Sequence, residues 1–176
     1  AARMAGLILG YAQQGGLADL EAARPELLLL LGADELPAER FAGAFRVYIG
    51  HHGDAGARTA DLVLPGAAYS EKHGTYVNTE GRVQRAERAT FPPGEAREDW
   101  SIFRAVSALI GKPLKFDNFD QLRNAMVTEY LELGRDGLIK LDWSPPKLEA
   151  KASGPVGYAV RDFWLTNAIC RHSPTM

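Results

Sequence analysis

Three short runs of apolar residues lie in the first half of the chain, and each ends in a loop that carries glycine. The runs are Leu27 to Leu31, Phe45 to Ile49 and Asp61 to Leu64. A strand that is apolar at nearly every position is typical of a parallel sheet with both faces covered. The pattern therefore predicts an α/β fold with a partial parallel sheet, whose three strands are buried on both faces.

The loops after these strands are expected to face one common edge of the sheet, because the carboxyl ends of parallel strands meet there. Ligands of α/β domains usually bind at this edge, so it is the first place to look for chemistry. The loops are Gly32 to Asp34, Gly50 to Arg58 and Pro65 to His73.

Apolar residues at helical spacing predict four helices that flank the sheet. The first, Met4 to Gln14, is expected to end at Gly15-Gly16, and the second covers Leu17 to Arg24. Two longer helices, Glu98 to Ile110 and Phe119 to Leu133, are predicted later in the chain.

Between Gly74 and Ala89 the pattern changes to that of a β-hairpin or sharp corner. Thr75 to Val77 and Arg82 to Arg85 predict two short strands, joined by a turn at Asn78 to Gly81. Gly81 stands at the last position of that turn, so we expect it to adopt a positive φ, which glycine tolerates without steric cost.

The chain from Leu141 onward has too little apolar periodicity to form a domain of its own, and it carries Pro145-Pro146 and Ser153-Gly154-Pro155. We interpret residues 1–140 as the C-terminal portion of an α/β domain. Residues 141–176 are interpreted as an extended tail that docks on partner surfaces, because a long tail is costly to order unless it lies on a surface.

The composition is that of an ordinary soluble globular protein, with 46% hydrophobic residues, 24% charged residues and a net charge of -2. This balance disfavours a nucleic-acid partner, which usually requires a concentrated basic face. Arg82, Arg85 and Arg88 do cluster, but Glu80 and Glu87 lie among them, so a solvated strand face is the favoured interpretation.

No apolar run approaches the roughly 18 residues that a membrane-spanning helix requires, so direct membrane insertion is not predicted. No signal peptide is visible either. The first residue is Ala1, and we expect the chain to be processed, truncated or one piece of something larger.

Candidate chemistry along the chain is sparse. His51, His52 and Asp54 lie together and His73 lies in a later loop, but a metal site needs three or four converging ligands. Adjacent histidines point apart if their segment is extended, so ordinary loop histidines are favoured. Ser70 precedes His73 without a glycine-flanked nucleophile elbow and without an acid placed to orient the histidine, which disfavours hydrolysis.

Binding of common cofactors also lacks support in the sequence. Neither a GxGxxG nor a GxxxxGK[ST] pattern occurs. Cys170 is the only cysteine, which excludes an internal disulfide and an iron–sulfur cluster held by this chain alone, since such clusters usually need four thiolates. We therefore predict no catalytic, cofactor-binding or metal-binding residue on this chain.

One long segment, from Ala60 to Gln84, closely resembles the corresponding stretch of the molybdopterin oxidoreductase superfamily. It resembles especially the branch formed by the largest iron–sulfur subunits of respiratory complex I, the 75-kDa subunits. Gly50 to Ala57, Pro92 to Trp100 and Arg161 to Ile169 resemble the same branch, the last of them its C-terminal end. The likeness runs from about Leu27 to Met176, and the four motifs occur in the right order.

The resemblance implies a molybdopterin-oxidoreductase-like fold that is kept without the pterin cofactor. It implies that the chain is a non-catalytic scaffold within NADH:ubiquinone oxidoreductase, the proton-translocating assembly that passes electrons from NADH to ubiquinone. Iron–sulfur clusters are then expected on the missing N-terminal half and FMN on a neighbouring subunit. The implied partners are that N-terminal half and other subunits of the peripheral arm, on the matrix side of the mitochondrial inner membrane or the cytoplasmic face of a bacterial membrane.

Two other interpretations stay open. The chain is alternatively a fragment of an active molybdopterin-dependent oxidoreductase, similar to formate dehydrogenase. Active relatives continue into a β-rich cofactor-binding domain, whereas Gly111 to Met176 reads as a helix followed by a proline-bearing tail, and this difference favours complex I. A free-standing interaction protein would need a fold that is complete without the missing half.

Overall fold

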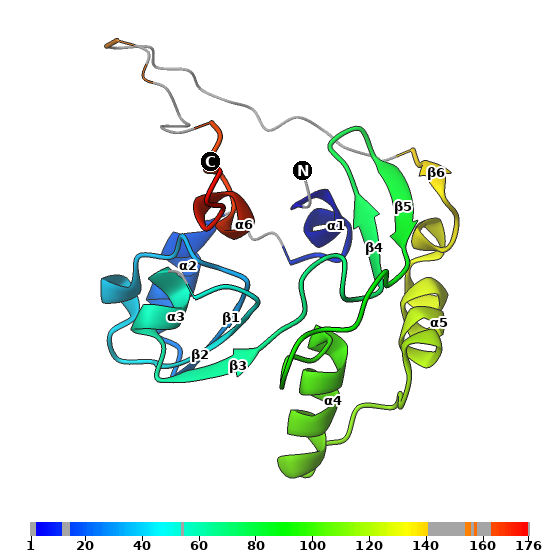
Figure 1. Cartoon of the computed structure of the whole chain (residues 1–176), viewed down its shortest axis with the longest axis horizontal. Helices are drawn as coiled ribbons and strands as arrows, with labels where there is room; N and C mark the ends of the chain where they lie inside the picture. The colour runs from blue at the N-terminus through cyan, green and yellow to red at the C-terminus, as the bar shows by residue number, and fades with distance from the viewer. Residues whose placement is uncertain are drawn as a thin grey trace. The chain divides into compact units, whose positions relative to one another are not determined.

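The computed structural model describes residues 3–11, 15–53, 55–140, 154–155, 157 and 163–175 of the chain (Figure 1). The chain divides into two compact units, residues 1–139 and 140–176, which are described separately. The first unit holds one parallel and one antiparallel sheet, each of three strands. The predicted mixed α/β class with a partial parallel sheet and a hairpin is confirmed.

The parallel sheet consists of β1 (Leu27–Leu31), β2 (Phe45–Gly50) and β3 (Leu62–Pro65), in that spatial order. All three predicted strands are present to within one residue at either end. The register places Leu29 beside Val47, and Val47 beside Leu62. Neighbours across a sheet point their side chains to the same face, so these three residues share one face.

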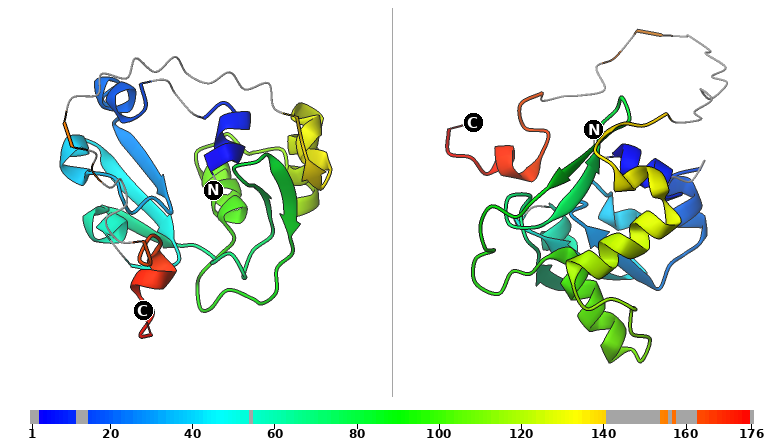
Figure 2. Two further views of the ribbon diagram at one scale, coloured as in Figure 1. Left: turned by 90° about the horizontal axis from the view of Figure 1, so that it is seen from above. Right: turned by 90° about the vertical axis from the view of Figure 1, so that its right-hand side faces the viewer.

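One face of the parallel sheet carries the larger core of this unit. Leu28, Leu30 and Tyr48 point to it and are buried. The elements that cover it are short, namely α2 (Leu17–Ala22), the 3₁₀ turn η1 (Ala38–Phe41) and α3 (Ala55–Thr59). They contribute Leu20, Phe41 and Ala57 to the cluster, and Figure 2 shows them on one side of the strands.

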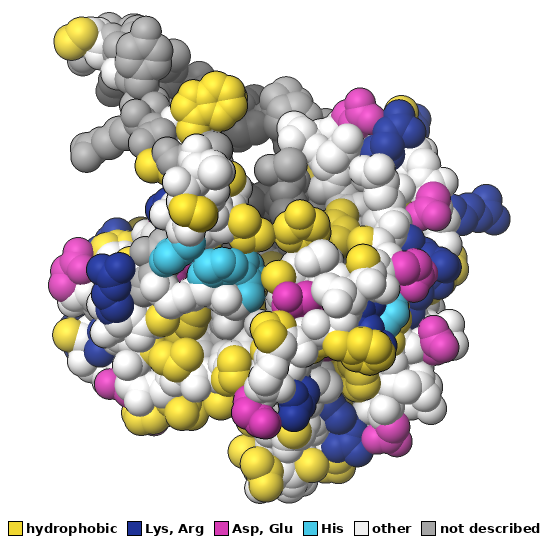
Figure 3. Space-filling model, in the orientation of Figure 1, with side chains coloured by type: hydrophobic (Ala, Val, Ile, Leu, Met, Phe, Trp, Pro, Cys, Tyr) yellow, Lys and Arg dark blue, Asp and Glu magenta, His cyan; other side chains and the backbone are white. Residues whose placement is uncertain are grey.

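The opposite face of the same sheet is buried at the central strand, where Val47 and Ile49 are 7% and 2% exposed, but it is open along β1. Leu27, Leu29 and Leu31 are 56%, 48% and 52% exposed, and Phe45 and Leu62 are 52% and 44% exposed. Figure 3 shows hydrophobic side chains at the surface in the region of these strands.

The prediction that the strands are buried on both faces is therefore confirmed for the middle of β2, where Val47, Tyr48 and Ile49 are all buried, and wrong for β1 and β3. The elements α2, η1 and α3 all pack on the face of Leu28 and Leu30, which leaves the other side of β1 exposed.

A carboxylate at the start of β3 ties that strand to β2. The backbone N–H of Arg46 donates a hydrogen bond of 2.7 Å to Asp61 Oδ2, and the Arg46 guanidinium lies 3.4 Å from the same oxygen. The backbone donor, followed by the guanidinium, holds the pKa of the Asp61 carboxyl below its ordinary range. The charged carboxylate therefore closes the amino-terminal end of the β2–β3 ladder.

The antiparallel sheet has the order β4–β5–β6, with β4 at Gly74–Val77, β5 at Arg82–Ala86 and β6 at Gly137–Leu138. The hairpin of β4 and β5 is as predicted, whereas β6 was missed because a two-residue strand leaves no periodic signal. Val77, Val83 and Leu133 form a second buried core here, each at most 2% exposed. The helices α1 (Arg3–Ile8) and α5 (Phe119–Glu129) pack against it through Ile8 and Met126.

Two helices end several residues before their predicted ends. Helix α1 ends at Ile8 rather than continuing toward Gln14, because Gly10 adopts a φ of 73° and turns the chain. Helix α5 stops at Glu129, where Tyr130 leaves the helical region, and a 3₁₀ turn η2 (Leu131–Gly134) follows. The predicted helix before α5 is present as α4 (Asp99–Leu109).

Residues 141–176 were predicted to form an extended tail, and most of that prediction lies outside the described residues. Within residues 163–175 the chain departs from an extended conformation at one short helix, α6 (Ala168–Arg171), which the sequence analysis did not predict. Asn167 caps this helix by accepting a hydrogen bond of 3.0 Å from the Cys170 backbone N–H. Among the described residues, no helix has the length and hydropathy needed to cross a membrane.

The hairpin turn has the backbone conformation that the sequence predicts. Gly81 adopts a φ of 88°. Asn78 Oδ1 accepts hydrogen bonds from the backbone N–H groups of Glu80 and Arg82, at 3.2 and 2.8 Å. The Gly81 N–H closes the turn onto the Asn78 carbonyl at 3.0 Å.

Replacement of Gly81 by a β-branched residue is expected to strain this turn. Gly81→Val should lower the free energy of unfolding by more than about 1 kcal/mol, whereas Gly81→Asn should lower it less, because asparagine tolerates positive φ. Denaturant-induced unfolding of both variants measures the difference. Equal stability of the two variants would show that the positive φ carries no cost.

Candidate functional site

The loops at the carboxyl edge of the parallel sheet are joined to one another by hydrogen bonds. The Gly32 N–H donates to the Ile49 carbonyl at 2.8 Å, and the Gly66 N–H donates to the Gly50 carbonyl at 2.9 Å. Asp34 Oδ1 accepts from the backbone N–H of Gly56, in α3, at 3.2 Å. The three predicted loops therefore meet at one edge, as the parallel topology requires.

Glycines at this edge make room for a side chain of the protein itself. The Tyr48 ring, 2% exposed, lies beneath the loop that follows β2. A Cβ atom at Gly56 would stand 2.7 Å from Tyr48 Cε2 and 2.9 Å from the Ala33 carbonyl oxygen. The Tyr48 hydroxyl donates to the His52 carbonyl at 3.2 Å. These contacts fill the space under the loop with protein atoms.

His51 and His52 were expected to point apart, and the structure corrects this. The chain bends at these residues instead of running extended, so the two rings meet edge to face with their centroids 4.7 Å apart. Their Nδ1 atoms are 2.5 Å apart. Desolvation, followed by repulsion from His52 and Lys72, lowers the pKa of the His51 imidazole.

The segment before α4 binds the loop that follows β3. The backbone N–H of Ala67 donates to the Arg97 carbonyl at 2.9 Å, and the Arg97 N–H donates to the Pro65 carbonyl at 3.1 Å. Lys72 forms an ion pair with Asp99 at the start of α4. A Cβ atom at Gly66 would come within 3.2 Å of Asp99 Oδ1, so the chain packs closely here.

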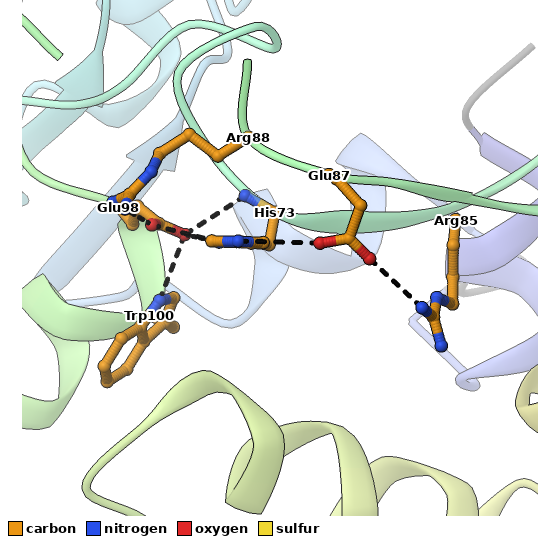
Figure 4. A network of polar contacts seen from close by, with 6 residues as sticks. All are labelled: His73, Arg85, Glu87, Arg88, Glu98 and Trp100. Carbon is orange, nitrogen blue, oxygen red and sulfur yellow. Dashed lines mark hydrogen bonds and ion pairs between the residues drawn. The ribbon is translucent and has the colours of Figure 1, made fainter. Parts of the chain in front are cut away.

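A buried carboxylate, Glu98, stands at the centre of this region (Figure 4). Its side chain is 10% exposed, and it accepts hydrogen bonds of 3.2 Å from the His73 backbone N–H, Arg88 Nη1 and Trp100 Nε1. His73 Nδ1 is also 3.2 Å from Glu98 Oε1. A carboxylate removed from water needs such donors, because desolvation of an unpaired charge costs several kcal/mol.

His73 joins this network to the second sheet and to α5. Its ring stacks on Phe119, the first residue of α5, with the centroids 5.0 Å apart. Its Nε2 atom faces Glu87 Oε2 at 3.7 Å, and Glu87 in turn accepts from Arg85 Nη2 at 3.1 Å. Arg82 and Arg85 pair with the exposed carboxylates of Glu80 and Glu87, in agreement with the predicted solvated surface, whereas Arg88 pairs with the buried Glu98.

The prediction that no acid is placed to orient a histidine is wrong. Glu98 contacts His73 Nδ1 from a position 25 residues later in the chain, which local sequence patterns do not reveal. A catalytic triad would then require a nucleophile at Nε2, but Nε2 faces the Glu87 carboxylate instead of Ser70. The network has the chemistry of a structural ion cluster.

The candidate metal-binding histidines do not converge. His51 and His52 lie after β2, whereas His73 belongs to the Glu98 network. Within the part of the chain that the structure describes, no three histidine, cysteine, aspartate or glutamate side chains are grouped to hold a metal ion. Cys170 is a free thiol in α6, where its Sγ accepts a contact of 3.2 Å from Asn167 Nδ2.

The sequence matches the family model described as molybdopterin oxidoreductase over residues 1–109, which is more than half of the chain. The chain belongs to the molybdopterin oxidoreductase family. A second family model, which describes the C-terminal region of an NADH-ubiquinone oxidoreductase subunit, matches residues 139–176. The two matches follow one another along the chain, and they confirm the resemblance proposed from the four motifs.

Three similar proteins are all named as subunits of NADH-ubiquinone oxidoreductase. The chain is 45% identical to the mitochondrial 78 kDa subunit of NADH-ubiquinone oxidoreductase from Neurospora crassa, over 90% of the chain and 23% of the relative. It is 43% identical to the 75 kDa subunit from Reclinomonas americana, over 85% of the chain and 22% of the relative. The mitochondrial 78 kDa subunit from Candida albicans is 39% identical over the whole chain and 26% of the relative. The chain thus spans about a quarter of the length of these relatives.

The Glu98 network should contribute measurably to stability. Glu98→Gln removes the negative charge that faces Arg88 and turns amide hydrogens toward existing donors, so the free energy of unfolding should fall by about 1–3 kcal/mol. Glu95→Gln is the matched control, because Glu95 pairs with Arg97 at 3.2 Å but its side chain is 88% exposed.

Denaturant unfolding of both variants gives the comparison. The Glu95 variant should lie within about 0.5 kcal/mol of the parent chain, since exposed ion pairs contribute little. An unchanged stability of the Glu98 variant would contradict the central place assigned to this carboxylate.

Proposed function

We propose that the chain is a non-catalytic structural part of the 75-kDa-type subunit of respiratory complex I, supporting electron transfer from NADH to ubiquinone in the peripheral arm. The observation that carries the proposal is the order of the two family matches. A molybdopterin oxidoreductase segment is followed by the C-terminal segment of an NADH-ubiquinone oxidoreductase subunit. The names of the relatives point to the same assembly.

The contacts at the carboxyl edge of the sheet support a structural role. In many α/β enzymes this edge binds the ligand. Here Tyr48 packs beneath the loop after β2, and the loop after β3 is bound to Arg97 and Asp99 by backbone hydrogen bonds and an ion pair. Such an edge holds strands and helices in place with the protein's own groups.

The chain should contribute no redox centre, and the clusters should lie on its partner. Its sequence has a single cysteine, Cys170, and an iron–sulfur cluster usually needs four thiolates. We propose that iron–sulfur clusters belong to the N-terminal half of the same subunit, on the same or a separate polypeptide, and FMN to a neighbouring subunit. Two of the relatives are named as mitochondrial, which supports a mitochondrial location, and we propose that the chain lies on the matrix side of the inner membrane.

The domain division forms part of the proposal. Residues 1–140 would be the C-terminal portion of the α/β domain, and residues 141–176 would dock on partner surfaces. Phe163 and Trp164 are 74% and 70% exposed, and their rings lie edge to face with centroids 5.6 Å apart. Exposed aromatic residues of this kind are typical anchors at protein interfaces.

A fragment of an active molybdopterin enzyme is the alternative. The match of residues 1–109 to the general family model is compatible with both functions. The match of residues 139–176 to the NADH-ubiquinone oxidoreductase model favours complex I, because it covers the region where an active enzyme would continue into a cofactor-binding domain.

The purified chain is expected to bind no iron, molybdenum or flavin. Elemental analysis and absorbance spectroscopy of the isolated chain should give well under one metal ion or flavin per chain. The same measurements on the complex that contains the chain serve as the control, and they should detect both iron and flavin. Stoichiometric molybdenum on the chain or its complex would support the alternative function.

Affinity capture of the tagged chain from its source organism tests the proposed assembly. The captured complex should oxidise NADH with ubiquinone as acceptor and should include a cysteine-rich polypeptide or segment. Loss of the chain should lower the amount of assembled complex, because a scaffold acts on assembly. A captured complex that reduces no quinone, or that reacts with formate instead, would contradict the proposal.

A further inference from the structure

The two edges of the parallel sheet differ in their chemistry. The β1–β2 ladder begins at the Glu26 carbonyl and ends at the Gly32 N–H, so the even-numbered residues of β1 face β2. The backbone groups of Leu27, Leu29 and Leu31 therefore point away from β2, because neighbouring residues of a strand alternate in direction. In the described part of the chain no strand pairs with this edge.

Unpaired edges of stable sheets usually carry charges or proline, which prevent pairing with another strand. β1 has neither, since all five of its residues are leucine. The opposite edge, on β3, ends in Pro65, and beyond it Gly66 forms a parallel bridge with Arg97. The β1 edge thus has the composition of an interior strand, while the β3 edge is already closed at one end.

The handedness of the connections points to the same edge. Connections between neighbouring parallel strands are right-handed in nearly all proteins. The links from β1 to β2 and from β2 to β3 run in the same direction across the sheet, and their elements pack on the same face. Any further strand added beyond β3 in this sense would place its connection on that covered face too. A right-handed connection places its elements on the opposite face only if it crosses the sheet in the reverse direction, that is, from the β3 side to the β1 side or farther beyond β1.

The uncovered face is suited to a helix with an apolar stripe. Its exposed residues are Leu27, Leu29, Leu31, Phe45 and Leu62, with no charged side chain among them, and they surround Val47 and Ile49 of β2, which are already buried. Native parallel sheets are covered by helices on both faces. A crossover helix that follows an added parallel strand would fill this requirement.

We propose that the sheet continues beyond β1. An added strand would pair with β1 in parallel, and a crossover helix from the same segment would cover the face of Leu27, Leu29 and Leu31. This inference rests on the proposed function for its partner, which is the part of the longer subunit that this chain does not contain. The relatives are about four times longer than the matched region, so they hold ample chain for such a unit.

Amide hydrogen exchange tests the edge directly. It is measured on the isolated chain and on the chain within the complex captured from its source. In the complex, exchange at Leu29 and Leu31 should slow by at least about 100-fold relative to the isolated chain, because their N–H groups gain partners. The N–H group of Val63, on the outer side of β3, is the control and should change much less.

Slow exchange at Leu28 and Leu30 in the isolated chain shows that the β1–β2 ladder is formed there. If the isolated chain lacks that protection, the exchange of Leu29 and Leu31 is compared with that of Val63 within the complex alone. Protection of the β3 edge in place of the β1 edge would overturn the inference. Protection of Leu29 that needs only a second copy of this chain would also overturn it.

Two matched substitutions test the uncovered face. Leu29 and Val63 are 48% and 47% exposed in the same sheet, but they lie on opposite faces. Leu29→Lys should reduce incorporation into the captured complex by at least about tenfold, because it would place a charge under the covering helix. Val63→Lys should incorporate normally. Equal incorporation of both variants would overturn the inference.

The outcomes separate this inference from the proposed function. A chain that assembles into complex I while Leu29 and Leu31 still exchange rapidly would refute the added strand and leave the function in place. A chain that assembles into a different complex, with the β1 edge protected, would refute the function and leave the added strand in place.

Discussion

The buried carboxylate of Glu98 is the interaction on which the arrangement of the first unit depends. It accepts hydrogen bonds from the loop after β3, from the segment after β5 and from α4, through His73, Arg88 and Trp100. An acceptor with two charged oxygens can bind several donors at once, and a buried position strengthens each bond. The parallel and antiparallel sheets have separate apolar cores, so this polar cluster supplies a connection between them.

The second governing constraint is the handedness of the parallel connections. Because both links run in the same direction, η1 and α3 lie on one face, which holds Leu28, Leu30 and Tyr48. Helix α2, which precedes β1, packs on the same face. The same rule leaves Leu27, Leu29 and Leu31 exposed in a strand made only of leucine. The chain therefore has the interior of a larger sheet on its surface, in agreement with relatives that extend well beyond the matched region.

These features are those of a structural segment, whose role depends on the protein surfaces against which it packs. The loops at the carboxyl edge are filled by Tyr48 and bound to Arg97, which favours rigidity over ligand exchange. The three histidines that were considered as metal ligands lie at two separate sites and make different contacts. His51 and His52 stand at the bend after β2, while His73 holds Glu98 and Phe119 together. In this chain, the glycines and histidines of the family fold therefore make packing contacts and structural hydrogen bonds.

The sequence by itself determined the elements whose signals are local. Strands β1 to β3 follow from apolar runs, and the turn at Gly81 follows from its position after Asn78, because side-chain periodicity and backbone freedom act within a few residues. Tertiary structure decided what depends on distant contacts. It placed Glu98 against His73, added β6 to the hairpin and left one side of β1 exposed. The five leucines of β1 indicate a strand that is buried on both faces. The residues that cover each face, however, lie far away in the chain or beyond it.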